Sequence, residues 1–159
     1  MNFTIDEFYP TPFGLITDML SYVKLNNVTS ILEPSAGKGN IAKYLHDTAK
    51  SNGRHALDID TIEIDPELQH VLKGNGFRVI HNDFLTFSTF KRYDLVIMNP
   101  PFSSGDRHLL HALHFVRGKG QIVCLLNAET LKNPYTNTRR ELSRRLSELG
   151  ADIRFRGLA

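Results

Sequence analysis

The sequence contains a single cysteine, Cys124, and no apolar stretch long enough to span a bilayer. The lone cysteine excludes an internal disulfide bond, so nothing in the sequence requires an oxidising compartment. The first ten residues, MNFTIDEFYP, carry acidic side chains but no basic cluster, unlike a secretory signal. We therefore expect a cytoplasmic protein with no membrane partner.

Charge is unevenly distributed along the chain. The 159 residues, enough for one domain, carry a formal net charge of +2. Residues 1–90 hold seven Lys/Arg against eleven Asp/Glu, whereas residues 91–159 hold twelve against six. The basic half is either a phosphate-facing surface or a solvated helix face, since four of its arginines lie in TRRELSRRLSELG.

Strand-like apolar runs alternate with amphipathic segments over most of the chain. This alternation predicts an α/β fold with a mostly parallel sheet and helices on both faces. We expect one domain over residues 1–159, with an N-terminal helical segment (1–27) and an α/β core (28–159). The expected strands cover residues 28–34, 57–65, 77–84, 93–99, 121–127 and 151–159, and the expected helices cover residues 13–25, 40–52, 66–76, 107–120 and 137–150.

A glycine turn, EPSAGKGN, follows the first expected strand. Gly37, Gly39 and Ala42 match the spacing G-x-G-x-x-A of dinucleotide-binding turns, although such a match alone is weak evidence. Glu33, at the tip of the strand, would repel a pyrophosphate and would suit a cationic ammonium group. The turn therefore favours a ligand that presents an amine, and no phosphate, at this point.

Acidic residues also end the next two expected strands. Glu63 is placed to accept hydrogen bonds from both hydroxyls of a ribose, although Asp65 competes for this role or caps the following helix. Asp83 is placed to accept from an exocyclic amine, with Phe84 against a ring. Because parallel strands end at one edge of the sheet, these acids favour a single ligand with an amine, a ribose and an adenine. S-adenosyl-L-methionine has those parts.

Three histidines, His108, His111 and His114, recur at every third residue of an expected helix. No cysteine or acidic residue accompanies them at a matching spacing, so we expect no metal site. Surface or half-buried positions are the expectation for all three.

Taken in order, the motifs FYPTP, LEPSAGKGN, IEIDPE, NDFL and NPPF resemble those of the class I S-adenosylmethionine-dependent N6-adenine DNA methyltransferases. The resemblance runs from Phe8 to about Ala128, has the gamma order of motifs, and is strongest to phage and prophage enzymes. It implies a Rossmann-like class I methyltransferase fold, S-adenosyl-L-methionine as cofactor and adenine-containing DNA as substrate. Loops related to NPPF also occur in methyltransferases that act on RNA bases and on protein glutamine.

The resemblance also implies a role for each motif residue. From the methionine end of the cofactor to its adenine, the binding residues would be Thr11, Pro12, Glu33, Ser35, Ala36, Gly37, Glu63, Asp83 and Phe84. The catalytic loop would be formed by Asn99, Pro100, Pro101 and Phe102.

The NPPF loop suits methylation of an exocyclic amine, whose delocalised lone pair makes it a poor nucleophile. The Asn99 side-chain oxygen and the Pro100 carbonyl would accept its two hydrogens and localise the lone pair. The two prolines keep the loop stiff and remove competing N–H donors. Phe102 offers a face on which an extruded base stacks. Cys124 lies in mid-strand, so we expect a small core residue there and no nucleophile.

The sequence departs from the family after the fifth expected strand. The family sheet ends in an antiparallel hairpin, whereas this sequence ends at Ala159, near the first strand of that pair. We expect an incomplete hairpin, no target-recognition region, and a fifth strand whose open edge invites self-association or a partner chain. An inactive cofactor-binding module that works with a partner is therefore an alternative to methylation of DNA, RNA or glutamine.

Overall fold

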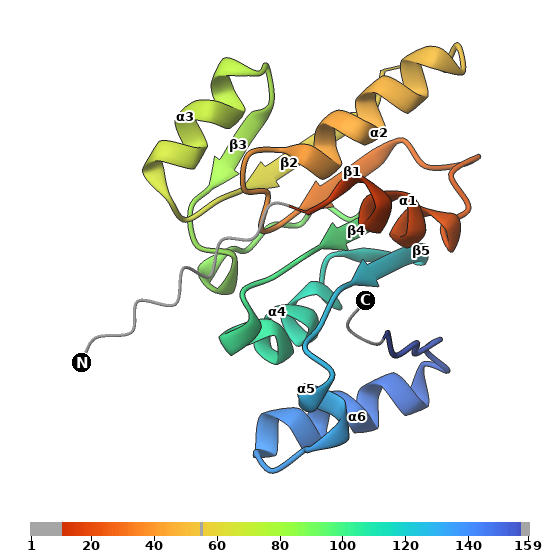
Figure 1. Ribbon diagram of the computed structural model, residues 1–159, viewed down its shortest axis with the longest axis vertical. Coiled ribbons are helices and arrows are strands. Elements are labelled where there is room, and N and C mark those ends of the chain that lie inside the picture. The colour runs from red at the N-terminus through yellow and green to blue at the C-terminus, as the bar shows by residue number, and fades with distance from the viewer. Residues whose placement is uncertain (1–10, 55, 157–159) are drawn as a thin grey trace.

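The computed structural model describes residues 11–54 and 56–156, and its centre is one parallel sheet (Figure 1). The spatial order of the strands is β3-β2-β1-β4-β5, and every pairing is parallel. The strands are β1 (Ser30–Glu33), β2 (Asp58–Ile62), β3 (Arg78–His81), β4 (Tyr93–Met98) and β5 (Val116–Cys124). The predicted α/β fold is therefore confirmed.

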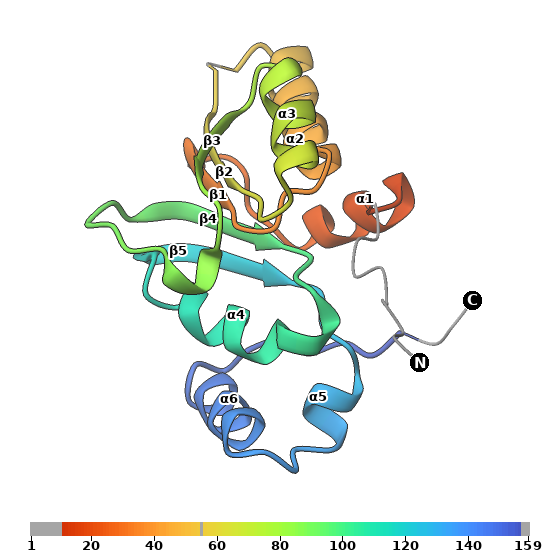
Figure 2. The same ribbon diagram turned by 90° about the vertical axis from the view of Figure 1, so that its left-hand side faces the viewer.

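Helices cover both faces of the sheet (Figure 2). On one face, α1 (Phe13–Ser21) and α2 (Asn40–Ser51) share an apolar core with β1 and β4. On the other face lie α4 (Gly105–Ala112) and the 3-10 turn η1 (Phe84–Thr86), with α6 (Asn137–Glu148) packed on α4. The remaining elements are α3 (Pro66–Gly74), η2 (Phe102–Ser104) and α5 (Glu129–Lys132). Among the helices that the structure describes, none combines the length and the apolar character needed to cross a bilayer.

The central strand β4 is buried on both faces, as expected for an apolar run in a parallel sheet. Leu95 and Ile97 belong to the core on the α1 and α2 side, whereas Val96 and Met98 belong to the core on the α4 side. All four side chains are fully buried. The loop that follows β4 therefore starts from the fully buried end of a strand inside the sheet.

The expected boundary between the fourth helix and the fifth strand is wrong. The apolar spacing predicts a helix to residue 120, but α4 ends at Ala112 and β5 begins at Val116. The pairing of β4 with β5 shifts register between Tyr93 and Leu95, so extra residues of β5 bulge from the ladder. At Gly120 an added Cβ would lie 3.0 Å from two backbone oxygens, which makes the bulge dependent on glycine.

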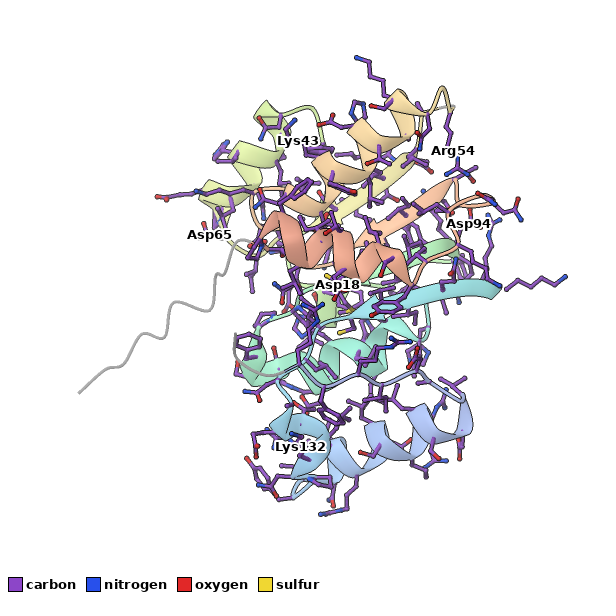
Figure 3. All side chains as sticks on the ribbon, turned by 45° about the vertical axis from the view of Figure 1, so that its right-hand side comes forward. Asp18, Lys43, Arg54, Asp65, Asp94 and Lys132 are labelled. Carbon is purple, nitrogen blue, oxygen red and sulfur yellow. The ribbon has the colours of Figure 1, made fainter. Side chains whose placement is uncertain are left out.

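The expected sixth strand is absent from the described residues 151–156, which have no regular structure. This segment leaves α6 on one face of the sheet and reaches α1 on the other, past the edge strand β5 (Figure 1). Arg156 forms an ion pair with Asp18 of α1. The Lys132 Nζ of α5 lies 4.7 Å from the ring centroid of Phe155. Asp18 and Lys132 are labelled in Figure 3. Side-chain contacts thus hold the segment, without the backbone pairing of a strand.

An ion-pair cluster around the buried Asp60 joins β2, β3 and β4. Asp60, whose side chain is 6% exposed, accepts hydrogen bonds from Arg78 Nε (2.6 Å), Lys91 Nζ (2.9 Å) and the Tyr93 hydroxyl (2.6 Å). Burial raises the pKa of Asp60, but the three donors outweigh it and leave the pKa below its usual value. Sequence patterns gave no sign of this cluster, because its members are far apart in the chain.

We expect Tyr93→Phe to lower the free energy of unfolding by roughly 1.5–3 kcal/mol, because a hydrogen bond to a charged acceptor is lost. Asp60→Asn should cost at least as much, since it also removes the charge that faces Lys91 and Arg78. The depressed pKa of Asp60 means that its contribution is present at neutral pH and is lost as the pH falls through that pKa. Urea unfolding of wild type and Asp60→Asn at about pH 7 and about pH 3 checks this, and an equal difference at both pH values would contradict it.

Candidate active site

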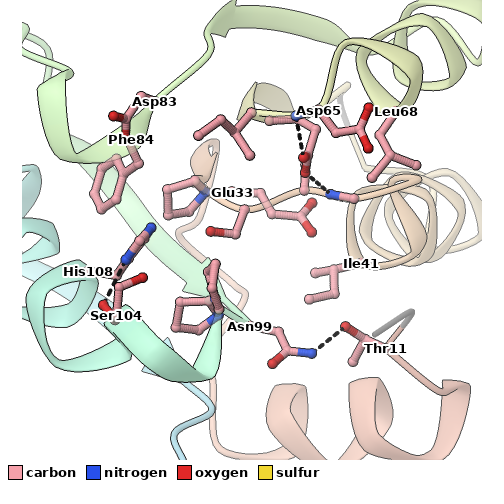
Figure 4. Close-up of a pocket in the computed structure, with 18 of the residues that line it drawn as sticks. Thr11, Glu33, Ile41, Asp65, Leu68, Asp83, Phe84, Asn99, Ser104 and His108 are labelled. Atoms are coloured by element: carbon pink, nitrogen blue, oxygen red, sulfur yellow. Dashed lines mark hydrogen bonds between the residues drawn. The ribbon is translucent and has the colours of Figure 1, made fainter. Parts of the chain in front are cut away.

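A cavity of about 430 Å³ lies beyond the carboxyl ends of β1 to β4 (Figure 4). All of the residues that the sequence placed in the site line this cavity except Pro12. Pro12 is exposed and precedes α1, where its carbonyl accepts from the N–H groups of Leu15 and Ile16. The strand tips therefore converge on one cavity, as their order in the sequence predicts.

Glu33, the last residue of β1, has a buried carboxylate oxygen with no hydrogen-bond partner among the described residues. The residue is 1% exposed. Burial raises its pKa well above the usual value; the backbone N–H of Ala42 opposes this, and the charge of Glu63 adds to it. A buried, unpartnered acid of this kind is held protonated or is paired with a cationic or hydrogen-bonding ligand that offsets its desolvation.

Glu63 follows β2 and links it to the glycine turn. Its two carboxylate oxygens accept from the backbone N–H groups of Gly37 (2.7 Å) and Asp65 (3.0 Å). Asp65 is exposed and caps α3 by accepting from the N–H of Glu67 at 2.8 Å. Of the two acids that the sequence left open, Glu63 is thus the one held rigidly against the turn, and Asp65 is the helix cap.

The glycine turn brings the start of α2 close to α3. Gly39 has a φ of 89°, in the left-handed region, and an added Cβ would lie 2.9 Å from Leu72 Cδ2. Backbone conformation and packing both require glycine at this position. Gly39 is therefore required by the packing of the turn against α3, whether or not the turn also binds a ligand.

Asp83 and Phe84 lie at the tip of β3. Asp83 caps η1 by accepting from the N–H of Leu85 at 3.0 Å. Phe84 is buried, and its ring packs against His111 and Phe115 with centroids 4.8 Å and 5.6 Å apart. Phe84 thus belongs to the core as well as to the cavity wall.

The NPPF loop leaves β4 at Asn99 and begins η2 at Phe102. The Asn99 side-chain N–H donates to the Thr11 hydroxyl at 3.1 Å, and Figure 4 shows this bond at one end of the cavity. Pro100 is buried, Pro101 is half-buried, and Phe102 is 49% exposed. The loop therefore presents to the cavity, in chain order, the amide of Asn99, the restricted backbone of the two prolines and the partly exposed ring of Phe102.

The hydrogen bond with the Thr11 hydroxyl engages the Nδ2 end of the Asn99 amide. The hydroxyl accepts from Nδ2, which leaves Oδ1 without that partner. We expect Thr11→Val, which keeps the shape and removes the hydroxyl, to lower the turnover of whatever reaction Asn99 serves by about tenfold. Thr17→Val, in α1 outside the cavity, is the matched control, and steady-state turnover is the measurement. Equal turnover of the two variants would contradict this role.

The structure also places in the cavity residues that the sequence analysis did not assign to it. They include Pro34, Lys38, Asn40, Ile41, Ile64, Leu68, Asn82, Leu85, Ser104 and His108. Most lie within the quoted motifs, and three others follow a motif by one or two positions, so the motifs themselves were the available signal. His108 is different: it was expected at a surface or half-buried position, but it is 7% exposed and faces the cavity.

Cys124 is partly buried in the cores around α4 and does not line the cavity. Burial raises the pKa of its thiol, which keeps it protonated and unreactive at neutral pH. Over the described part of the chain, no three His, Cys, Asp or Glu side chains are grouped to hold a metal ion. The polar side chains that line the cavity are therefore carboxylates, amides, hydroxyls, one lysine and one imidazole.

The fold is that of class I S-adenosylmethionine-dependent methyltransferases, as a comparison with solved structures shows. A protein from Listeria monocytogenes described as such an enzyme matches with a TM-score of 0.71 at 13% identity, over 90% of this chain and 53% of the other. Coclaurine N-methyltransferase, solved with N-methylheliamine and S-adenosylhomocysteine, matches with a TM-score of 0.58 at 11% identity, over 70% and 34% of the two chains.

The chain belongs to the methyltransferase small domain family, whose model matches residues 17–131. It is similar to a tRNA1(Val) (adenine(37)-N6)-methyltransferase of Flavobacteriaceae bacterium (strain 3519-10), with 28% identity over 49% of this chain. It is also similar to the type II methyltransferase M.CvrRI of Paramecium bursaria Chlorella virus XZ-6E, with 32% identity over 59% of this chain. The matches span 35% and 24% of these two relatives. The predicted class, a methyltransferase domain that uses S-adenosyl-L-methionine, is confirmed by the family.

Proposed function

We propose that this chain binds S-adenosyl-L-methionine in the cavity and methylates the exocyclic N6 amine of adenine in DNA. The observation that carries the proposal is the unpartnered carboxylate oxygen of Glu33, buried in the same cavity as the NPPF loop. One feature calls for a cation, and the other presents acceptors to an amine. Together they define a donor subsite and an acceptor subsite in one cavity.

The cavity suits S-adenosyl-L-methionine, which supplies a methyl group on a positively charged sulfur. Its volume of about 430 Å³ is in the range of small-molecule sites. Glu33 would bind the ammonium group and so satisfy its free oxygen. Glu63, whose oxygens are already fixed by two backbone N–H groups, would use its remaining lone pairs for the ribose hydroxyls. Asp83 would accept from the adenine amine.

The acceptor subsite is formed by Asn99 and Pro100. The Asn99 Oδ1 and the Pro100 carbonyl would each accept one hydrogen of the substrate amine. Both acceptors are fixed before the substrate arrives, because Thr11 binds the Asn99 amide and the prolines restrict the backbone. The lone pair of the amine is then localised toward the methyl donor, and no covalent intermediate with the protein is needed.

The substrate base would stack on Phe102. Half of this ring is exposed although it lies beside a deep cavity. A target adenine in a duplex cannot reach Asn99 unless it is extruded from the stack, and an aromatic face stabilises the extruded base. Phe102 therefore provides the surface that a flipped-base mechanism requires.

Adenine in RNA is the second candidate substrate, because the similar proteins include tRNA adenine-N6 methyltransferases as well as a viral type II enzyme. The DNA assignment is supported by the motif set that begins at FYPTP, of which residues 8–10 lie outside the described residues. Both substrates present the same N6 amine to the same loop. The choice between them affects the nucleic-acid surface and leaves the chemistry of Asn99 unchanged.

A labelling experiment separates the candidates. The chain is incubated with methyl-labelled S-adenosyl-L-methionine and separate pools of DNA, RNA and protein, and modified nucleosides and amino acids are identified by mass spectrometry. We expect N6-methyladenine in the DNA. Label in RNA adenine would transfer the proposal to the second candidate, and label only in protein glutamine would refute it. No label, with S-adenosylhomocysteine still bound in calorimetry, would indicate an inactive cofactor-binding module.

A further inference from the structure

His108 is a buried histidine in the cavity wall to which the proposed function gives no role. It lies in α4, is 7% exposed, and lines the cavity between Phe84 and the NPPF loop (Figure 4). Its ring centroid is 5.8 Å from that of Phe84. The residue is thus next to the tip of β3, on the side of the cavity away from the Asn99–Thr11 bond.

The hydrogen bond of His108 fixes its tautomer. Its Nδ1 lies 2.8 Å from the carbonyl oxygen of Ser104, which can only accept, so Nδ1 carries the hydrogen. Burial lowers the pKa of the imidazole; the bond to Ser104 and the charge of Asp83 oppose this, and Arg107 and His111 add to it. The ring is therefore neutral at neutral pH, and its Nε2 holds a lone pair that faces the cavity (Figure 4).

Asp83 provides a second acceptor on the same side of the cavity. Asp83 and His108 line the same cavity, and Phe84, which follows Asp83 in the chain, has its ring next to that of His108. An exocyclic amine on an aromatic ring carries two hydrogens in one plane, whereas a 6-oxo group carries none. Two acceptors at such a position select an amine and reject a carbonyl, because the mismatch leaves the buried acceptor of His108 unpaired.

We propose that His108 Nε2 and Asp83 accept the two amine hydrogens of the cofactor's adenine, so that His108 determines the base specificity of the cofactor subsite. This inference rests on the proposed function, because it takes the ligand of the cavity to be an adenosyl compound. Asn99 serves the substrate amine in the other part of the cavity. Two amines are thus recognised by separate pairs of acceptors.

The test compares by calorimetry S-adenosylhomocysteine and its 6-oxo analogue S-inosylhomocysteine, in which an oxo group replaces the amine and the neighbouring N1 gains a hydrogen. Wild type should bind the adenosyl compound at least about tenfold more tightly. His108→Phe keeps a ring but removes the acceptor, and should lower affinity for the adenosyl compound by about three- to tenfold without weakening the inosyl compound. His108→Gln, which offers a side-chain oxygen, should retain the discrimination. His114→Phe, at an exposed position after the end of α4 and outside the cavity, is the matched control and should retain it too.

Selective loss of discrimination in His108→Phe supports the role. Unchanged affinities, or an equal loss for both ligands, would show that His108 only supports the packing around Phe84, and would overturn the inference. If wild type binds neither ligand, the proposed cofactor subsite itself fails. That outcome is distinguishable from failure of the His108 inference alone, in which wild type binds S-adenosylhomocysteine and the affinity does not depend on His108.

Discussion

Replacement of Asn99 with alanine should reduce methyl transfer by at least about a hundredfold, as is typical when a fixed polar group of a catalytic subsite is removed. The side chain bonds Thr11 and faces the substrate subsite, whereas the groups proposed to hold the cofactor lie on β1, β2 and β3. Affinity for S-adenosylhomocysteine should therefore change by less than about threefold. Turnover is measured by methyl incorporation into the substrate identified by the labelling experiment, and affinity by calorimetry.

Asn26→Ala is the matched control for Asn99→Ala. Asn26 is exposed and lies outside the cavity, so the same truncation there should leave turnover and affinity unchanged. Turnover near the wild-type level in Asn99→Ala would refute its role as an acceptor. A parallel loss of turnover and of cofactor affinity would instead place Asn99 in the cofactor subsite.

Replacement of Glu33 with glutamine should have two opposite effects, on binding and on folding. The charge-assisted bond to the ammonium group is lost, which should weaken binding of S-adenosylhomocysteine by roughly 1.5–3 kcal/mol, or about 10- to 150-fold. Calorimetry measures this loss. Glu67→Gln, an exposed acid on α3, is the control and should bind as wild type does. Unchanged affinity in Glu33→Gln would show that Glu33 does not bind the ligand.

The same substitution should stabilise the protein without ligand at neutral pH, by about 1–3 kcal/mol, because a buried unpartnered charge is removed. The pKa of Glu33 is raised in the folded state, so the folded protein holds this proton more tightly than the unfolded chain does. Its stability therefore falls as the pH rises from the usual carboxyl range through the raised pKa. Urea unfolding across this window should show that slope in wild type and a smaller one in Glu33→Gln. A less stable Glu33→Gln at neutral pH would contradict the argument.

The parts of the fold that were predicted correctly depend on local signals. The expected strands were located from short apolar or alternating stretches, and the acids and the NPPF loop follow such stretches. Their meeting at one edge then follows from the parallel topology. The structure confirms that the acids and the NPPF loop line one cavity, while their chemical roles stay predictions. The cap by Asp65 was one of the two readings left open, and backbone geometry decided it.

The sequence-based predictions fail where contacts between residues distant in the chain determine the local structure. The spacing of apolar residues continues a helix past Ala112, but the register of β5 on β4 starts the strand at Val116. The segment 151–156 alternates like a strand, yet ion pairs and ring contacts with α1 and α5 hold it across the edge. His108 is buried because Phe84, distant in sequence, packs against it. No local pattern contains these partners.

The strand β4 carries consequences for how such a domain diverges in evolution. At its first residue, Tyr93 is bonded to the ion-pair cluster around Asp60, and directly after its last residue comes Asn99. A strand of this length separates the two by about 20 Å. Mutations in the cluster should therefore change the free energy of unfolding, and mutations at Asn99 should change the proposed catalytic activity. We expect little energetic coupling between the two sets of mutations. Lineages of this domain are free to exchange one set of residues for another at the start of the strand while they keep the chemistry at its end.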